Sequence, residues 1–153
     1  MAYVPEGRNW YIAELVVEIT VGGDSRNVVH RNLVLVSADS PEEAYDASVR
    51  LGRHSEASYE NPVGSPVRLL FRGVSKLSVI YERLEHGAEL SYEEHVDIPA
   101  EEINRWIPPK NLLGVFRSIE CSPGPDYSSK EILEEASDLV KNNGLSHPLN
   151  HSN

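Results

Sequence analysis

The chain has few of the features that would place it in a membrane or in an oxidising compartment. It has one cysteine, Cys121, among 153 residues, and a single thiol cannot form an intramolecular disulfide bond. Its apolar runs are far shorter than the ~20 residues that a membrane-spanning helix needs. The opening residues, MAYVPEGRNW, lack the basic region and apolar core of a secretory signal. We therefore expect a cytoplasmic protein that does not contact a membrane.

Basic residues are also few. The chain carries 14 lysine and arginine residues against 24 aspartate and glutamate residues, which gives a formal net charge of −10. Such a charge repels phosphate backbones, so we expect no nucleic-acid partner and consider a basic protein the better candidate. The hydrophobic fraction of 40% with 25% charged residues is typical of a globular chain that can bury one core.

An alternating stretch near the N-terminus predicts a β-hairpin. Residues 10–21, WYIAELVVEITV, place apolar side chains on every second position, which is the period of a strand. The turn-forming residues GGDSRN follow, and residues 28–37 have a second strand pattern. The short connection favours an antiparallel pair. The predicted inward face of the first strand consists of Tyr11, Ala13, Leu15, Val17, Ile19 and Val21.

A helix is predicted to begin just after Ser40. The order SPEE offers Ser40 as the N-cap, Pro41 at the first helical position and Glu43 as the acidic partner of a capping box. Small side chains recur along the following residues at helical spacing, which would let this helix approach a sheet closely. The predicted contact face consists of Ala44, Ala47, Ser48 and Leu51.

Further strands are predicted in the middle of the chain. Residues 66–72 alternate like a strand, and Gly73 indicates a bulge or a sharp bend. Residues 76–84 and 88–96 flank a Glu-His-Gly turn, so we expect a second antiparallel hairpin there.

A short helix is expected over residues 99–107 and a last short strand over residues 112–118. The predicted fold class is α+β, with a mostly antiparallel sheet of about five or six strands and one main helix packed on a face.

The composition changes after Ser118, and we predict a boundary there. Residues 1–118 would form the α+β domain, and residues 119–153 would form a linker and a C-terminal amphipathic helix with a frayed end. The apolar stripe of that helix would need a cover, and self-association through it is one possibility. The stripe consists of Ile132, Leu133, Ala136, Leu139 and Val140.

The stretch YERLEHGAELSYEEHVD, residues 81–97, combines six carboxylates with two histidines. In the predicted hairpin Glu82, Glu93 and His95 point to the same face, and we interpret this face as the solvated side of a sheet. The alternative is that these three residues form a metal or acid–base site. Their spacing matches no metal-binding motif such as HExxH, so we expect no metal ion and no cofactor.

A second pair of carboxylates, Glu14 and Glu18, shares the outward face of the first predicted strand. Under a cleft such a group could act as an acid or a base. We favour instead an ion pair with an arginine across the sheet, such as Arg68 or Arg72.

Three stretches, WYIAELVVEI, SADSPEEAYDAS and FRGVSKLSVIYERLEHGAELSYEE, resemble a bacterial family catalogued as domain of unknown function 4288. The later stretch IPPKNLLGVF looks similar too, so the resemblance runs from Trp10 to Phe116. It implies a small bacterial α+β domain, and it brings no assigned activity or catalytic residue.

Two classes of function agree with these observations. The first is a non-enzymatic binding or interaction module, such as an acidic immunity-type protein that masks a basic protein; the charge and the lack of a catalytic motif favour it. The second is a small metal-dependent hydrolase that uses Glu82, Glu93 and His95. A bound metal ion or a deep pocket at these side chains would distinguish the hydrolase from the binding module.

Overall fold

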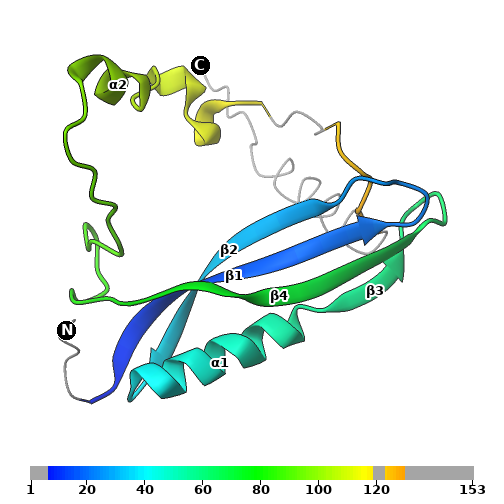
Figure 1. Ribbon diagram of the computed structural model, residues 1–153, viewed down its shortest axis with the longest axis horizontal. Helices are drawn as coiled ribbons and strands as arrows, with labels where there is room; N and C mark the ends of the chain where they lie inside the picture. The colour runs from blue at the N-terminus through cyan, green and yellow to red at the C-terminus, as the bar shows by residue number, and fades with distance from the viewer. Residues whose placement is uncertain (1–6, 119–122, 130–153) are drawn as a thin grey trace, which may run out of the picture. The chain divides into compact units, whose positions relative to one another are not determined.

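The computed structural model describes residues 7–118 and 123–129, and the chain forms two compact units (Figure 1). The first unit comprises Met1–Val79 and Gly124–Asn153, and the second comprises Ile80–Pro123. The described strands all belong to the first unit, and the second contains short helices.

The sheet of the first unit is antiparallel throughout, with the strand order β2-β1-β4-β3 (Figure 1). The predicted N-terminal hairpin is confirmed, because β1 and β2 pair continuously from Asn9 opposite Ala38 to Ile19 opposite Val28. The strands are β1 (Asn9–Val21), β2 (Val28–Ala38), β3 (Ala57–Glu60) and β4 (Pro66–Val79).

The antiparallel sheet with a packed helix agrees with the predicted α+β class, but the described residues contain four strands rather than five or six. The predicted strand at 66–72 continues to Val79, because Gly73 pairs with Val16 between two bulges of β4 and does not end the strand. Gly73 has a φ of 147°, which a residue with a side chain rarely adopts. β3 was not predicted, since four residues give too short a pattern.

The predicted hairpin of residues 76–84 and 88–96 does not form, and no strand lies between residues 80 and 99. Residues 76–79 instead belong to β4 and pair with β1, and the chain leaves the sheet from Ile80 onward. The last predicted strand is also wrong. Residues 112–118 lie partly in two 3₁₀ turns, Lys110–Leu112 and Gly114–Phe116, because their apolar side chains do not alternate.

The helix α1 (Pro41–His54) packs on one face of the sheet (Figure 1). Ala44 and Ser48 are buried as predicted, and the Ser48 hydroxyl donates to the Ala44 carbonyl at 2.7 Å. Leu51, however, is exposed, and Gly52 lies on the contact face instead. A Cβ atom at residue 52 would come within 2.2 Å of the Phe71 ring, so the close approach requires glycine here. The cluster beneath α1 consists of Tyr11, Ala13, Leu15, Val36, Ala38 and Ala44.

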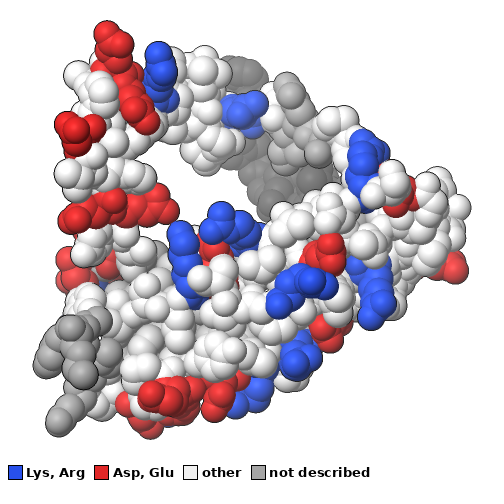
Figure 2. Space-filling model, in the orientation of Figure 1, with Lys and Arg blue, Asp and Glu red and all other residues white. Residues whose placement is uncertain are grey.

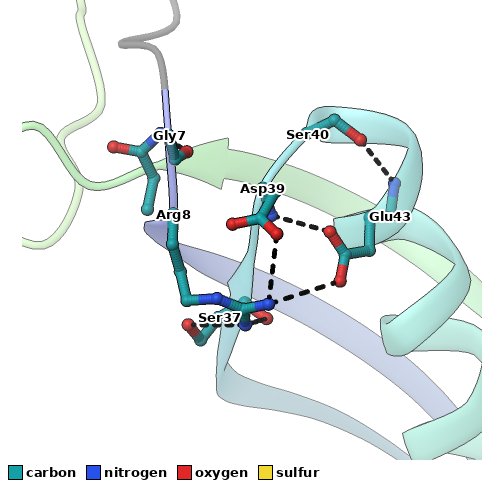
Figure 3. A network of polar contacts seen from close by, with 7 residues as sticks. Gly7, Arg8, Ser37, Asp39, Ser40 and Glu43 are labelled. Carbon is teal, nitrogen blue, oxygen red and sulfur yellow. Dashed lines mark hydrogen bonds and ion pairs between the residues drawn. The ribbon is translucent and has the colours of Figure 1, made fainter.

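The predicted capping box at the start of α1 is confirmed, with one difference (Figure 3). The Ser40 hydroxyl accepts a hydrogen bond from the Glu43 amide at 3.1 Å. The Glu43 carboxylate accepts from the amide of Asp39, at 2.8 Å, rather than from that of Ser40. Arg8 lies 3.3 Å from the Asp39 carboxylate and 3.7 Å from that of Glu43. The helix start is therefore tied to the residues just before β1.

The other half of the core lies between β1 and β4, where Val17, Ile19, Val21 and Val67 are buried. Residues Gly124–Ser129, which belong to the predicted linker, contact this part of the first unit. The Tyr59 hydroxyl donates to the Tyr127 carbonyl, and the buried Asn61 side chain donates to the Asp126 carbonyl at 2.9 Å. The predicted C-terminal helix falls almost entirely on residues 130–153, outside the described residues. Cys121 also lies outside the described residues.

The second unit contains the helix α2 (Ala100–Arg105), in agreement with the short helix predicted over residues 99–107. Among the described residues of this unit, the His95 and Trp106 rings have centroids 5.1 Å apart, and the Lys110 ammonium lies 5.2 Å from the Phe116 centroid. Within the described ranges, no helix has the length and apolar character needed to cross a membrane.

We predict that Ser40→Ala lowers the free energy of unfolding by about 1 kcal/mol, because the Glu43 amide loses its acceptor. Urea denaturation followed by circular dichroism measures the change. Ser25→Ala, in the exposed turn before β2, is the matched control and should stay within about 0.5 kcal/mol of the unmodified chain. An unchanged midpoint for Ser40→Ala would show that this cap does not stabilise the helix.

Candidate functional site

The three candidate residues of the predicted acidic face lie in the second unit, in a stretch without a helix or strand. His95 and Glu93 are neighbours, with 3.5 Å between the His95 Nε2 and the Glu93 Oε2. Glu82 instead accepts a hydrogen bond from the amide of Glu89 at 3.0 Å. The structure therefore brings Glu93 and His95 together, while Glu82 binds a backbone amide at the far side of its own turn.

The Glu93–His95 pair is solvent-exposed, with side-chain exposures of 71% and 48%. A distance of 3.5 Å is at the limit of a hydrogen bond, and exposed pairs contribute little to stability. Catalytic zinc sites need three protein ligands around one ion. In the parts of the chain that the structure describes, no group of three or more histidine, cysteine, aspartate or glutamate side chains could hold a metal ion.

Residues 80–102, which we name the acidic segment, have a distinct surface. The segment contains eight carboxylates and one arginine, Arg83. Large apolar side chains alternate with the acids and are exposed: Tyr81, Leu90, Tyr92 and Val96. Figure 2 shows acidic side chains following one another along this segment and the start of α2. Aromatic residues such as tyrosine are enriched at protein interfaces relative to the rest of the surface.

The second candidate pair lies on the face of the sheet opposite α1. Glu14 is only 8% exposed, and its Oε1 accepts from the Ser75 hydroxyl at 2.6 Å. The Arg31 guanidinium approaches the same oxygen at 2.6 and 2.8 Å. The Ser75 hydrogen bond, followed by that of Arg31, lowers the pKa of Glu14 despite its burial. Glu14 is therefore held as a carboxylate with its charge compensated, which is the structural role we predicted for this pair.

The partners of these carboxylates come from irregular positions. The pairing of β4 with β1 skips Ser75 and Arg72, so each is the extra residue of a bulge. Ser75 binds Glu14, and Arg72 lies 3.7 Å from Glu18, which also accepts from Asn27 at 2.7 Å.

Of the two arginines proposed from the sequence, Arg72 is confirmed for Glu18, while the partner of Glu14 is Arg31. The contact of Arg31 with Glu14 could have been predicted from the register of the hairpin. Arg31 pairs with Val16, which is next to Glu14 on the same face. The contact of Ser75 with Glu14 could not be predicted from the sequence, because it depends on the bulges of β4.

We predict that Glu14 makes stability depend on pH in the acid range. Its folded pKa lies below its ordinary value of 4.5, so its stabilising effect is present above pH 4.5 and is lost as the pH falls below that value. Asp24, whose pKa Arg26 lowers to about 2, acts with the same sign.

Urea unfolding at pH 7, 5, 4 and 3 tests this prediction. The loss of stability between pH 5 and pH 3 should be smaller in Glu14→Gln than in the unmodified chain. Ser75→Ala, which removes the largest cause of the lowered pKa, should reduce it as well. Glu60→Gln, at the exposed end of β3, is the control. Equal acid losses in Glu14→Gln and the unmodified chain would contradict the prediction.

We also predict that zinc, manganese and magnesium do not bind stoichiometrically, because Glu93 and His95 offer one close pair of donors. Isothermal titration calorimetry and elemental analysis of the purified protein measure binding. Tight binding of one equivalent that is lost in both Glu93→Ala and His95→Ala would instead establish a metal site. Glu60→Ala serves as the control for the loss of an exposed carboxylate.

Comparisons with curated proteins and with solved structures find no match. A family model matches residues 10–92, which include the sheet, α1 and the first part of the acidic segment. The similar stretch near residue 116 lies outside the match. The matched range comprises 83 of the 153 residues, more than half of the chain. The chain therefore belongs to the family described as Domain of unknown function (DUF4288).

Proposed function

We propose that the protein is a non-enzymatic binding module whose acidic segment binds a basic protein, in the manner of acidic immunity-type proteins. The uneven distribution of charge carries this proposal. The acidic segment holds eight carboxylates and one arginine, whereas residues 7–79 hold nine acidic and eight basic residues. Most of the net charge of −10 is thus concentrated in 23 consecutive residues. A field of one sign attracts a partner of the opposite sign and accelerates its association.

The apolar side chains of the segment supply the second requirement of an interface. Charges steer a partner, while buried aromatic residues provide most of the binding free energy. Tyr92 is 73% exposed and Val96 is 78% exposed, each within a few residues of several carboxylates. A partner with an apolar patch surrounded by lysine or arginine residues would match both properties.

The backbone of the segment supports the same proposal. Residues 80–99 take part in no helix or strand, so their amides and carbonyls are not committed to a ladder. Such a stretch can add to the edge of a partner's sheet or fold further on binding. We further propose a bacterial cytoplasmic setting, which a chain with one thiol suits. The same negative charge disfavours nucleic acid as the partner.

The alternative is a small metal-dependent hydrolase, and the close Glu93–His95 pair is the observation that favours it. The calorimetric titration described above separates the two proposals. A metal ion held by that pair would support the hydrolase.

Affinity capture from the host's own lysate tests the binding module. The unmodified chain should retain a basic protein at 50 mM salt and lose most of it at 500 mM. A variant with Glu82, Glu89, Glu93 and Glu94 changed to glutamine should lose this protein at both concentrations.

The matched control changes Glu42, Asp46, Glu56 and Glu60 of the first unit to their amides, which alters the net charge by the same amount. The control variant should retain the partner. Calorimetry with the purified partner should show that the acidic-segment variant binds at least tenfold more weakly than the unmodified chain, and that the control variant does not. Equal losses in both variants, or an acidic partner, would contradict the proposal.

A further inference from the structure

The strand β2 forms one edge of the sheet and has only β1 as a partner among the described residues. It is long, with 11 residues, and its register with β1 has no shift from one end to the other. A regular edge strand presents a row of amides and carbonyls that can pair with another chain.

The sequence of β2, VVHRNLVLVSA, contains one arginine or lysine that could hinder such pairing, Arg31, and its charge is held by Glu14 of β1. It has no proline, no glycine and no lysine, and its exposed apolar side chains include Val29, Leu33 and Leu35. The opposite edge strand β3 has only four residues. Tyr127 contacts side chains of both edge strands, Tyr59 of β3 and His30 of β2, whose ring centroid lies 5.5 Å from that of Tyr127. Of the two edges of the sheet that the structure describes, the β2 edge is therefore the long apolar one.

The strand is also complementary to itself. Its midpoint is Leu33, which is 64% exposed. In an antiparallel pair of two β2 strands centred there, Leu33 would face Leu33 of the other copy, and Arg31 would face Leu35. All 11 residues would find a partner, and like charges would not meet directly. The charge of Arg31 is already compensated by Glu14 at 2.6 Å, so its alkyl part can pack against leucine.

From this geometry we propose that the β2 edge binds a second copy of the same chain, with β2 antiparallel to β2 around a two-fold axis at Leu33. The two four-stranded sheets join into one continuous sheet of eight strands. A two-fold contact closes on itself, so it gives a dimer and not a fibre. This interface lies on the first unit and is independent of the partner proposed for the acidic segment.

Light scattering coupled to size exclusion tests the dimer with the full chain. The unmodified protein should elute with the mass of two chains at micromolar concentration. Leu33→Lys should elute as a monomer, because two like charges would meet at the axis. Val63→Lys, at a loop position that is 80% exposed, should remain dimeric. Far-ultraviolet circular dichroism checks that each variant is folded, as expected for substitutions at exposed positions.

A cysteine cross-link tests the register in a Cys121→Ser background. Opposite residues of antiparallel strands have Cα atoms about 4.5–5.5 Å apart, which suits a disulfide. Leu33→Cys should therefore form a covalent dimer on mild oxidation. In the same arrangement the two copies of Leu35→Cys are roughly 14 Å apart and should not form one. A monomeric unmodified chain would overturn the proposal, and so would a dimer that persists in Leu33→Lys. A covalent dimer formed by Leu35→Cys but not by Leu33→Cys would also overturn it.

Discussion

The structure of the first unit depends on the burial of one face of β1. This strand pairs on both sides, with β2 and with β4, and its alternate side chains from Tyr11 to Val21 are all buried. The two core clusters of the unit each contain three residues of β1. A one-residue slip of its register would turn all of these side chains to the opposite face. The helix α1 and the segment around Tyr127 both pack where this face needs a cover.

The same constraint explains the polar groups on the opposite face. Because β1 must keep its register, Glu14 stays on the face opposite α1, where its own side chain has little access to water and its charge needs partners. The sheet provides them by deforming β4 rather than β1. Its two bulges place Ser75 beside Glu14 and Arg72 beside Glu18, while Arg31 of the regular strand β2 compensates the charge of Glu14. This pair is therefore part of the fold, and an acid–base role is not needed to explain its presence.

The parts of the fold that were predicted from sequence are those whose signals are local. The period of residues 10–21, the turn residues after them and the cap at Ser40 each act within a few positions of the chain. The misassigned regions depend on distant groups. β3 exists because residues 57–60 meet β4, and the exposure of Leu51 follows from the place of the Phe71 ring. The hairpin predicted over residues 76–96 had turn chemistry and alternation in its favour, but residues 76–79 pair with β1 and the chain leaves the sheet after Val79.

Only part of the candidate site was predicted, again because local features are visible in the sequence and contacts between distant groups are not. The carboxylates of residues 81–97 are visible in the sequence, whereas their arrangement depends on whether strands form, and the structure gives one close pair, Glu93 with His95. The two surfaces proposed for binding differ in their physics. Attraction through the acidic segment is screened by salt within about 10 Å at 0.1 M. Pairing along β2 relies on backbone hydrogen bonds and apolar contacts, which salt screens little. Since the two proposed surfaces belong to different units, we expect the proposed dimer to persist at a salt concentration that would release a basic partner.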